Sequence, residues 1–422
     1  MREDFLHYIW QHKKFDQGAL KTVSGDSVQV LNTGQYLQQS GPDFFNAQIV
    51  IGSQRWAGNV EIHLKSSDWY AHRHETDSNY DTVILHVVWE HDTEVLRPNG
   101  SEIPVLELWR VVDNDLVNSY KALLSAKTWI NCEKEIGVAD GFLLGNWKER
   151  LFFERLERKA LPVMQLAKET SGDWEAVLFC FLAKNFGLNT NGEAFFNLAK
   201  SLPFGVVRKE MFELQNLEAL LFGRASLLMG DFEEVYPKAL QQQHAYIQHK
   251  YQLKPYTGIP LEFFRHRPDN FPTIRLAQLA ALYHTHQNLF SKIIHCNDLP
   301  ELRKLFSVQV SEYWHSHYRF DKESTPKRKG LSVSFVDLLI INSIVPVKFA
   351  YVQSLAKDNT EELISLLQQL EPESNAVVDK FKYYKVNVSS AYDSQALLQL
   401  KNEYCNNHRC MQCAVGISLL KS

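Results

Sequence analysis

The stretch that decides the fold runs from Ser40 to Asp92 and reads SGPDFFNAQIVIGSQRWAGNVEIHLKSSDWYAHRHETDSNYDTVILHVVWEHD. Apolar residues alternate with polar ones over residues 45–51 and 56–65, which predicts two neighbouring strands. The polar segment 66–80 predicts a loop and a short helix. Residues 82–89 are almost continuously apolar, which is typical of a central strand buried on both faces.

The flanking residues extend this sheet on both sides. Residues 2–14 have the spacing of an amphipathic helix, and residues 19–23 and 28–32 surround a turn sequence and predict a strand pair. A further strand is expected at 105–109, before a helix that begins near residue 115. The order of elements predicts a small α/β domain with a mixed sheet over residues 1–115.

Beyond residue 115 the apolar spacing changes to that of helices, interrupted at Gly and Pro. A length of 422 residues favours two or three domains, and 45% hydrophobic with 22% charged residues is an ordinary globular composition. We therefore expect residues 116–422 to form a larger all-α domain that ends in a cysteine cluster at 405–413.

Charge is distributed unevenly along the chain. Residues 1–115 hold 9 Lys and Arg against 17 Asp and Glu, a net charge of −8, so the remainder of a chain with net charge −4 carries +4. An acidic front domain suits metal cations and repels a polyanion, so phosphate contacts are expected in the rear domain. Arg265, Arg267 and Arg275 precede or begin a predicted helix and are the candidates; the alternative is that they pair with acids of the helical domain.

The expected location is the cytoplasm, without membrane contact. The N-terminal residues are charged from the second position, unlike a secretory signal. The most apolar run, residues 336–352, is interrupted by Asn342, Pro346 and Lys348 and is expected to fall short of a membrane span. The oligomeric state stays open.

Two carboxylates and a cation gather in the central stretch. Glu61, His63 and Lys65 stand at alternate positions, so they share one face of their strand. A hairpin between the two predicted strands brings Asp43 opposite Glu61. Carboxylates from adjacent strands are suitable ligands for the divalent metal that phosphodiester hydrolysis requires. The alternative is that Asp43 caps a turn while Glu61 and Lys65 line a solvated face.

Pro42-Asp43 and Glu61-Ile62-His63, within this order of elements, resemble the PD-(D/E)XK or restriction-endonuclease-like nuclease superfamily. The resemblance implies that Asp43 and Glu61 bind Mg or Mn and that the protein cleaves nucleic acid, DNA or RNA. His63 replaces the Lys of the motif, so His63 or Lys65 takes the role of handling the water. Glu3 on the first helix is the candidate for an assisting acid.

Two other functions stay open. The sheet could serve as a non-catalytic interaction or nucleic-acid-binding module. It could also be a histidine-based metallohydrolase of a small substrate, because five histidines occur within 29 residues and imidazoles suit Zn or Mn. These are His63, His72, His74, His86 and His91.

The C-terminal segment YCNNHRCMQCAVG supplies Cys405, His408, Cys410 and Cys413. These four residues are candidate ligands for Zn. The alternative metal is an iron–sulfur cluster, whose fourth thiolate could come from Cys132, Cys180 or Cys296. Reduced structural thiols are the third possibility.

The whole chain resembles an uncharacterised bacterial family of unknown function. The runs that carry the resemblance are SGPDFFNAQIVI, GNVEIHLKSSDW, VILHVVWEHD, RPDNFPTIRLAQLA and YCNNHRCMQCAVG. The resemblance covers nearly the full length and implies no substrate.

Overall fold

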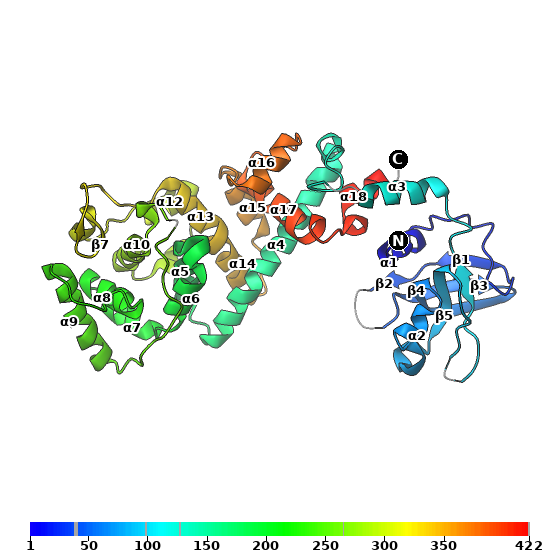
Figure 1. The fold of residues 1–422 in the computed structure, drawn as a ribbon, viewed down its shortest axis with the longest axis horizontal. Helices are drawn as coiled ribbons and strands as arrows, with labels where there is room; N and C mark the ends of the chain where they lie inside the picture. The colour runs from blue at the N-terminus through cyan, green and yellow to red at the C-terminus, as the bar shows by residue number, and fades with distance from the viewer. Residues whose placement is uncertain (38–40, 98, 126–127, 265, 421–422) are drawn as a thin grey trace. The chain divides into compact units, whose positions relative to one another are not determined.

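The computed structural model describes residues 1–422 apart from 38–40, 98, 126–127, 265 and 421–422 (Figure 1). The chain divides into two compact units. The α/β unit comprises Met1–Trp147, Tyr384–Val386 and Leu400–Ser422, and the helical unit comprises Lys148–Tyr383 and Asn387–Gln399. The boundary was expected at residue 115; in this division residues 116–147 and the C-terminal segment also belong with the α/β unit.

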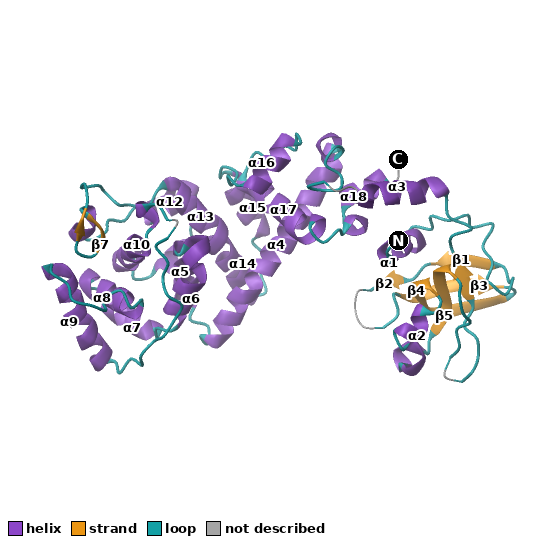
Figure 2. Cartoon of the chain, viewed as in Figure 1, coloured by secondary structure: helices purple, strands orange, loops and turns teal. Residues whose placement is uncertain are grey.

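A mixed sheet forms the centre of the α/β unit, as the sequence predicts (Figure 2). Its strand order is β1-β3-β4-β5-β6, with the short β2 paired to β3. The β1–β3 and β3–β4 pairs are antiparallel, whereas β4–β5 and β5–β6 are parallel. The strands are β1 (Val28–Asn32), β2 (Gln35–Tyr36), β3 (Phe44–Ile51), β4 (Gln54–Lys65), β5 (Val83–Glu90) and β6 (Val105–Glu107).

The strand sequences account for this arrangement. β5 is buried over its first six residues, as expected for a strand with parallel neighbours on both sides. The first half of β4 pairs with the antiparallel β3 and the second half with the parallel β5, and Gly58 lies next to this change of partner. A Cβ atom at Gly58 would lie 2.4 Å from Cγ2 of Ile84 and 2.7 Å from the carbonyl oxygen of Thr82. The absence of a side chain at Gly58 therefore lets the start of β5 pack closely against β4, just before Glu61 and His63.

Two helices cover the middle of the sheet. α1 (Glu3–Gln11) buries Phe5, Leu6 and Ile9 and packs against β4. α2 (Asp68–Ala71) also packs against β4 and is followed by two short turns, η1 (His74–Thr76) and η2 (Ser78–Tyr80), that lead into β5. Within residues 66–80 the helix α2 thus comes first and the turns follow. Ser66 and Ser67, directly after β4, donate to Asp92, and these bonds hold the start of the segment.

The remaining elements of the α/β unit come from both sides of the helical insertion. They are α3 (Asn114–Ser125), η3 (Ile136–Val138), the π-helical turn η7 (Leu400–Cys405), η8 (Cys410–Gln412) and α18 (Ala414–Leu419). η8 packs against α1 and α18, and Nη1 of Arg2 donates to the carbonyl oxygen of His408.

The second unit is mostly helical, as expected. One short hairpin, β7 (His317–Arg319) and β8 (Lys322–Glu323), departs from the all-α prediction. The helices are α4 (Gly141–Glu169), which begins in the α/β unit, α5 (Trp174–Phe186), α6 (Leu188–Lys200), α7 (Phe204–Glu210), α8 (Leu214–Arg224), α9 (Val235–Lys250), η4 (Pro268–Asn270), α10 (Pro272–Thr285), α11 (Leu289–Ile294), α12 (Leu299–Leu305), η5 (Glu312–His315), α13 (Val333–Leu339), the π-helical η6 (Ile340–Ile344), α14 (Val345–Ser354), α15 (Thr360–Gln368), α16 (Ala376–Tyr383) and α17 (Ala391–Gln399).

The apolar run near residue 340 is helical without a break. Val333–Ser354 is the one helix of the described chain that is long and apolar enough to cross a membrane, and 72% of its most apolar window is buried inside the fold. Asn342 and Pro346 therefore do not interrupt it, contrary to expectation. Lys348 is 1% exposed, and its Nζ donates to the carbonyl of Cys296 at 2.7 Å and to Oδ1 of Asn297 at 2.6 Å. This burial is that of a core helix.

Candidate functional site

Asp43 and Glu61 lie side by side where β3 and β4 pair. The register places Phe44 opposite Val60, and a bulge follows at Asn46, whose φ is +57°. The backbone N–H of Asp43 donates to Oε2 of Glu61 at 3.1 Å, and the N–H of Ile62 donates to Oδ2 of Asp43 at 3.0 Å. These reciprocal bonds hold one oxygen of each carboxylate, and bulges commonly direct side chains in this way beside functional sites.

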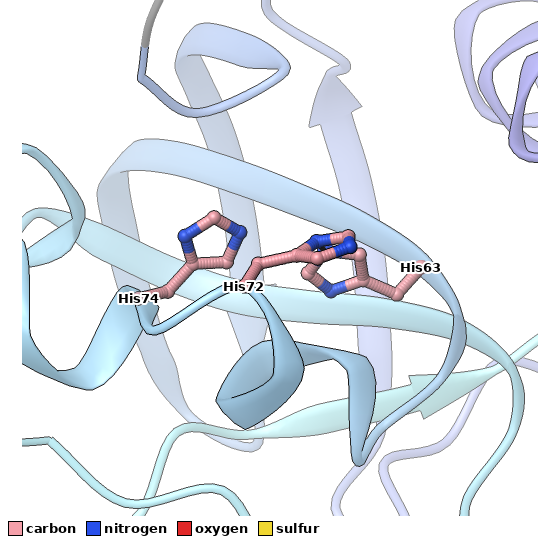
Figure 3. A group of neighbouring side chains, drawn as sticks. All are labelled: His63, His72 and His74. Atoms are coloured by element: carbon pink, nitrogen blue, oxygen red, sulfur yellow. Dashed lines mark hydrogen bonds between the residues drawn. The ribbon is translucent and has the colours of Figure 1, made fainter.

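Three imidazoles reach the same place from β4 and from the chain after α2 (Figure 3). Donor nitrogens of His63, His72 and His74 all lie within 4.8 Å of one another. Nε2 of His63 lies 3.1 Å from Nδ1 of His72. Oε1 of Glu61 lies 3.4 Å from Nε2 of His63 and 3.4 Å from Nε2 of His74. Glu61 and the three histidines therefore offer converging donor atoms.

α1 contributes a residue that the sequence analysis did not include. Nε2 of His7 lies 3.2 Å from Oδ2 of Asp43, and its Nδ1 lies 3.2 Å from the hydroxyl of Tyr36. Glu3, one helical turn earlier, interacts electrostatically with His7 and Asp43. The signal was present in the sequence, because residues four apart share one face of a helix, and Glu3 was already a candidate.

Burial controls the charges of this cluster. Burial, reinforced by the charge of Asp43, raises the pKa of Glu61 to about 9. Burial and the facing imidazole of His86 lower the pKa of His63 to about 2. Burial opposes protonation of His7, but its hydrogen bond to Asp43 and the charges of Asp43, Glu3 and Glu61 together outweigh this and raise the pKa of His7. At neutral pH the cluster thus contains a neutral His63, whose lone pair can bind a metal, beside a His7 whose surroundings favour its protonated form.

The site lies partly in the interior and partly at the surface. Glu61 is 5% exposed and His63 is 2% exposed, whereas His72 is exposed and the side chain of Asp43 is 22% exposed. A substrate can therefore approach from the side of His72 and Asp43. The donor set fits a divalent transition metal such as Zn or Mn, which accept imidazole and carboxylate together.

Trp69 and Tyr80 form the apolar wall of the site. Trp69 is 1% exposed and contacts the edges of His74 and His86 with ring centroids 5.4 and 5.5 Å away. Tyr80 stacks on His74 at 3.7 Å. Trp69 is thus a core residue that orients the histidines, and it offers no face to a nucleic-acid base.

Lys65 is turned away from the carboxylates. Its ammonium lies 4.0 Å from Oε2 of Glu90 and 4.0 Å from Oδ2 of Asp92, and the side chain is 51% exposed. Strand alternation put Lys65 on the same face as His63, but the long side chain extends toward the acids at the end of β5 and just after it. His91 likewise contributes its backbone N–H, which donates to Glu107 at 3.0 Å.

The predicted phosphate-binding arginines have different surroundings in the helical unit. Arg265 lies outside the described residues. Arg267 is exposed and lines a groove with Lys184, Lys327 and Arg328. The groove also contains acids, among them Asp269, Asp337 and Glu373. Its lining is therefore of mixed charge.

Arg275 is a buried packing residue, although it borders the same groove. It is 7% exposed, its Nη1 and Nη2 donate to Gln278 at 2.9 Å and Asn270 at 2.6 Å, and its guanidinium lies 3.6 Å above the ring of Phe335. These contacts engage both terminal nitrogens of the guanidinium, and burial keeps the group from an incoming phosphate.

A second donor group, Glu234, His317 and Glu323, lies in the helical unit. Nε2 of His317 lies 3.0 Å from Glu234, and its Nδ1 lies 2.9 Å from the carbonyl of Tyr313. The hydroxyl of Tyr313 donates to Glu234. Because both nitrogens of His317 have protein partners, we interpret this group as a structural hydrogen-bond network and not as a metal site.

The cysteine tail is assembled within the α/β unit. Cys405, Cys410 and Cys413 line one cavity together with Cys132. His408 is not among the described residues that line it; its carbonyl accepts from Arg2. Cys180 and Cys296 belong to the helical unit.

The fold and site define a class of protein in which a mixed-sheet unit carries a carboxylate–imidazole cluster and a helical unit is inserted into its sequence. The chain belongs to the family described as protein of unknown function (DUF2851), whose model matches residues 3–376. This confirms the predicted membership of an uncharacterised family. Comparisons with curated proteins and with solved structures find no match.

Proposed function

We propose that the α/β unit is a divalent-metal-dependent hydrolase that cleaves phosphodiester bonds, with nucleic acid as the substrate class. The observation that carries the proposal is the convergence of Glu61, His63, His72 and His74 beside Asp43. A cluster of this kind at the surface end of a sheet, with perturbed pKa values, is typical of a catalytic site.

The metal ligands in this proposal are Glu61, His63, His72 and His74, with Asp43 as a neighbouring carboxylate. When bound, the metal acidifies a water molecule and stabilises charge on the phosphate. Asp43 has a second role, because its Oδ2 lies 3.2 Å from His7 and orients that imidazole.

His7 is the cation of the proposed site, in place of His63 or Lys65, which were expected to handle the water. His63 is buried and neutral, and the ammonium of Lys65 faces Glu90 and Asp92. The contact with Asp43 favours the protonated form of His7, which can then supply a proton to the departing oxygen. This assignment supplies the positive charge that a phosphodiester substrate needs beside the metal.

The phosphodiester class is supported by the order of elements. A helix, an antiparallel meander, a helical connection and a parallel strand match the order on which the restriction-endonuclease-like expectation was based. The helical unit has exposed cations, such as Arg267 and Arg328, which are available to the phosphate groups of a nucleic acid.

A histidine-based hydrolase of a small substrate is the second candidate. The observation in its favour is that histidines outnumber carboxylates among the converging donors, which suits Zn or Mn more than Mg.

The test incubates the protein with single- and double-stranded DNA and RNA, and separately with a small-molecule phosphodiester, in the presence of Mg, Mn or Zn. Glu61→Gln and His7→Gln are the site variants, and Lys65→Ala is the matched control on the same strand. Cleavage that is lost in both site variants and kept in Lys65→Ala supports the proposal. Cleavage confined to the small ester favours the second candidate, and equal activity in Glu61→Gln overturns the site.

A further inference from the structure

Four cysteines surround a single cavity in the α/β unit, away from the histidine site. Cys132 lies between α3 and η3, Cys405 ends η7, Cys410 begins η8 and Cys413 directly precedes α18. The other lining residues are mostly apolar, including Leu123, Ile136, Leu400 and Val415. None of the four forms a disulfide. Four free thiols around one apolar space form the ligand set of a thiophilic metal centre.

The backbone around Cys413 is shaped to hold its sulfur. The N–H groups of Val415 and Gly416 hydrogen-bond to the Cys413 thiol. Gly416 is required here, because a Cβ atom at this position would lie 2.2 Å from the carbonyl oxygen of Cys410. Amide donors to sulfur stabilise a thiolate and are one of the means by which proteins tune metal–thiolate centres.

The sulfur of Cys410 is also oriented by a protein group. Nδ2 of Asn131 donates to Sγ of Cys410 at 3.4 Å. Asn131 directly precedes Cys132, so one short segment supplies one of the four sulfurs and orients another. The ligands therefore come from two parts of the chain, before and after the residues of the helical unit.

Burial in the cavity favours the uncharged form of its thiols. Burial raises the pKa values of Cys132 and Cys405, and the neighbouring sulfurs raise them further. Burial and Cys413 raise the pKa of Cys410 to about 11. A bound cation reverses this effect, since a coordinated thiol is deprotonated.

The spacing of the sulfurs selects among thiophilic metals. Tetrahedral Zn with bonds of about 2.3 Å requires sulfurs roughly 4 Å apart. Among the described residues, the groups of three or more donors within 4.8 Å of one another contain no cysteine. The four sulfurs are thus more widely spaced than a single Zn requires, and a cluster of several irons bridges wider distances. His408, the alternative Zn ligand, does not line the described cavity wall.

We propose that Cys132, Cys405, Cys410 and Cys413 ligate an iron–sulfur cluster. The cluster fastens the segment that precedes the helical unit to the segment that follows it. It also stabilises the tail beside α1, the helix that carries His7, since Arg2 donates to the carbonyl of His408 at 3.2 Å and η8 packs on α1. The proposal does not depend on the hydrolase function.

The experiment purifies the full chain without oxygen and measures iron, acid-labile sulfide, zinc and visible absorption, before and after incubation with ferrous iron and sulfide. Stoichiometric iron and sulfide with the absorption of a cluster is the expected result. Stoichiometric zinc in place of iron, or no metal after incubation, overturns the proposal. These wild-type measurements require no variant to fold.

Variants then identify the ligands. Cys132→Ser is expected to lose the iron and sulfide, and the matched control Cys296→Ser, a thiol of the helical unit, is expected to keep both. Far-ultraviolet circular dichroism establishes that each variant is folded. If Cys132→Ser does not fold, Cys410→Ser replaces it, because Cys410 is partly exposed in the tail. Full cluster content in a folded ligand variant contradicts the assignment.

Discussion

Nδ1 of His63 lies 2.8 Å from Nε2 of His86, a residue that is fully buried on β5. If His63 binds a metal through Nε2, its Nδ1–H donates to His86, and this bond fixes both the tautomer and the ring orientation. The arrangement makes His86 a positioning residue for the proposed metal site.

The first prediction is that His86→Phe weakens metal binding without removing a ligand. Loss of the acceptor for His63 is expected to reduce metal affinity about 10–100-fold. Isothermal titration calorimetry with Zn or Mn measures the change, and His91→Gln is the control, because the backbone N–H of His91, which donates to Glu107, is kept in that variant. Unchanged affinity in His86→Phe, with the fold intact, argues against His63 as a ligand.

The second prediction concerns pH. The pKa of Glu61 is raised to about 9 by burial and by Asp43, so Glu61 carries a proton at pH 7 when no metal is bound. Metal binding displaces this proton, and apparent affinity should rise about tenfold per pH unit between pH 6 and 8. Titrations in buffers of different ionisation enthalpy count the released protons. Glu61→Gln, which has no proton to release, should bind weakly and with a flatter pH dependence; an equally steep dependence would mean that another group releases the proton.

Part of this site followed from the sequence. The period-two pattern of residues 56–65 put Glu61 and His63 on one face, and a hairpin with the preceding strand brought Asp43 to Glu61. The bulge at Asn46 could not be predicted, because it depends on a positive φ and on the N–H of Asn46 bonding to Asn59. The spacing from Glu3 put His7 on the same face of α1, but its contact with Asp43 depended on how α1 packs on β4, which local periodicity does not specify.

Other differences have equally physical causes. Lys65 was placed by alternation alone, which ignores the acids Glu90 and Asp92 that attract a long side chain at the strand end. Arg275 looked like a phosphate ligand because guanidinium groups near helix N-termini often are. Its burial under Phe335 could be recognised only from the tertiary structure. Cys132 was one of three possible partners of the tail, and sequence distance gave no basis for choosing among them.

The third prediction tests the reassignment of Arg275. Arg275→Lys should destabilise the helical unit by about 2 kcal/mol, since Lys cannot keep both hydrogen bonds of the buried guanidinium. Arg267→Lys, on the exposed rim of the same groove, should change stability by less than about 0.5 kcal/mol. Urea unfolding followed by circular dichroism measures both. Equal stability of the two variants would restore Arg275 as a candidate for anion binding.

The fourth prediction concerns Glu218, a fully buried acid of α8 that accepts hydrogen bonds from the hydroxyls of Tyr236 at 2.6 Å and Ser311 at 3.0 Å. Burial raises its pKa from the ordinary 4.5 to about 7. The folded state therefore binds this proton more tightly than the unfolded chain. The stability that protonated Glu218 contributes is complete below pH 4.5 and is lost as the pH rises through 7.

Glu218→Gln keeps the shape of the protonated acid and cannot ionise. As the pH rises from 5 to 8, the wild type should lose the stability that depends on protonated Glu218, whereas the variant should not. A pKa shift of this size makes the expected difference in unfolding free energy roughly 3 kcal/mol. Thermal unfolding at the two pH values measures the difference. The control is Glu213→Gln at the exposed start of α8, which should leave the pH dependence of the wild type unchanged. A parallel pH dependence for wild type and Glu218→Gln would show that Glu218 is ionised throughout, with its charge stabilised by Tyr236 and Ser311.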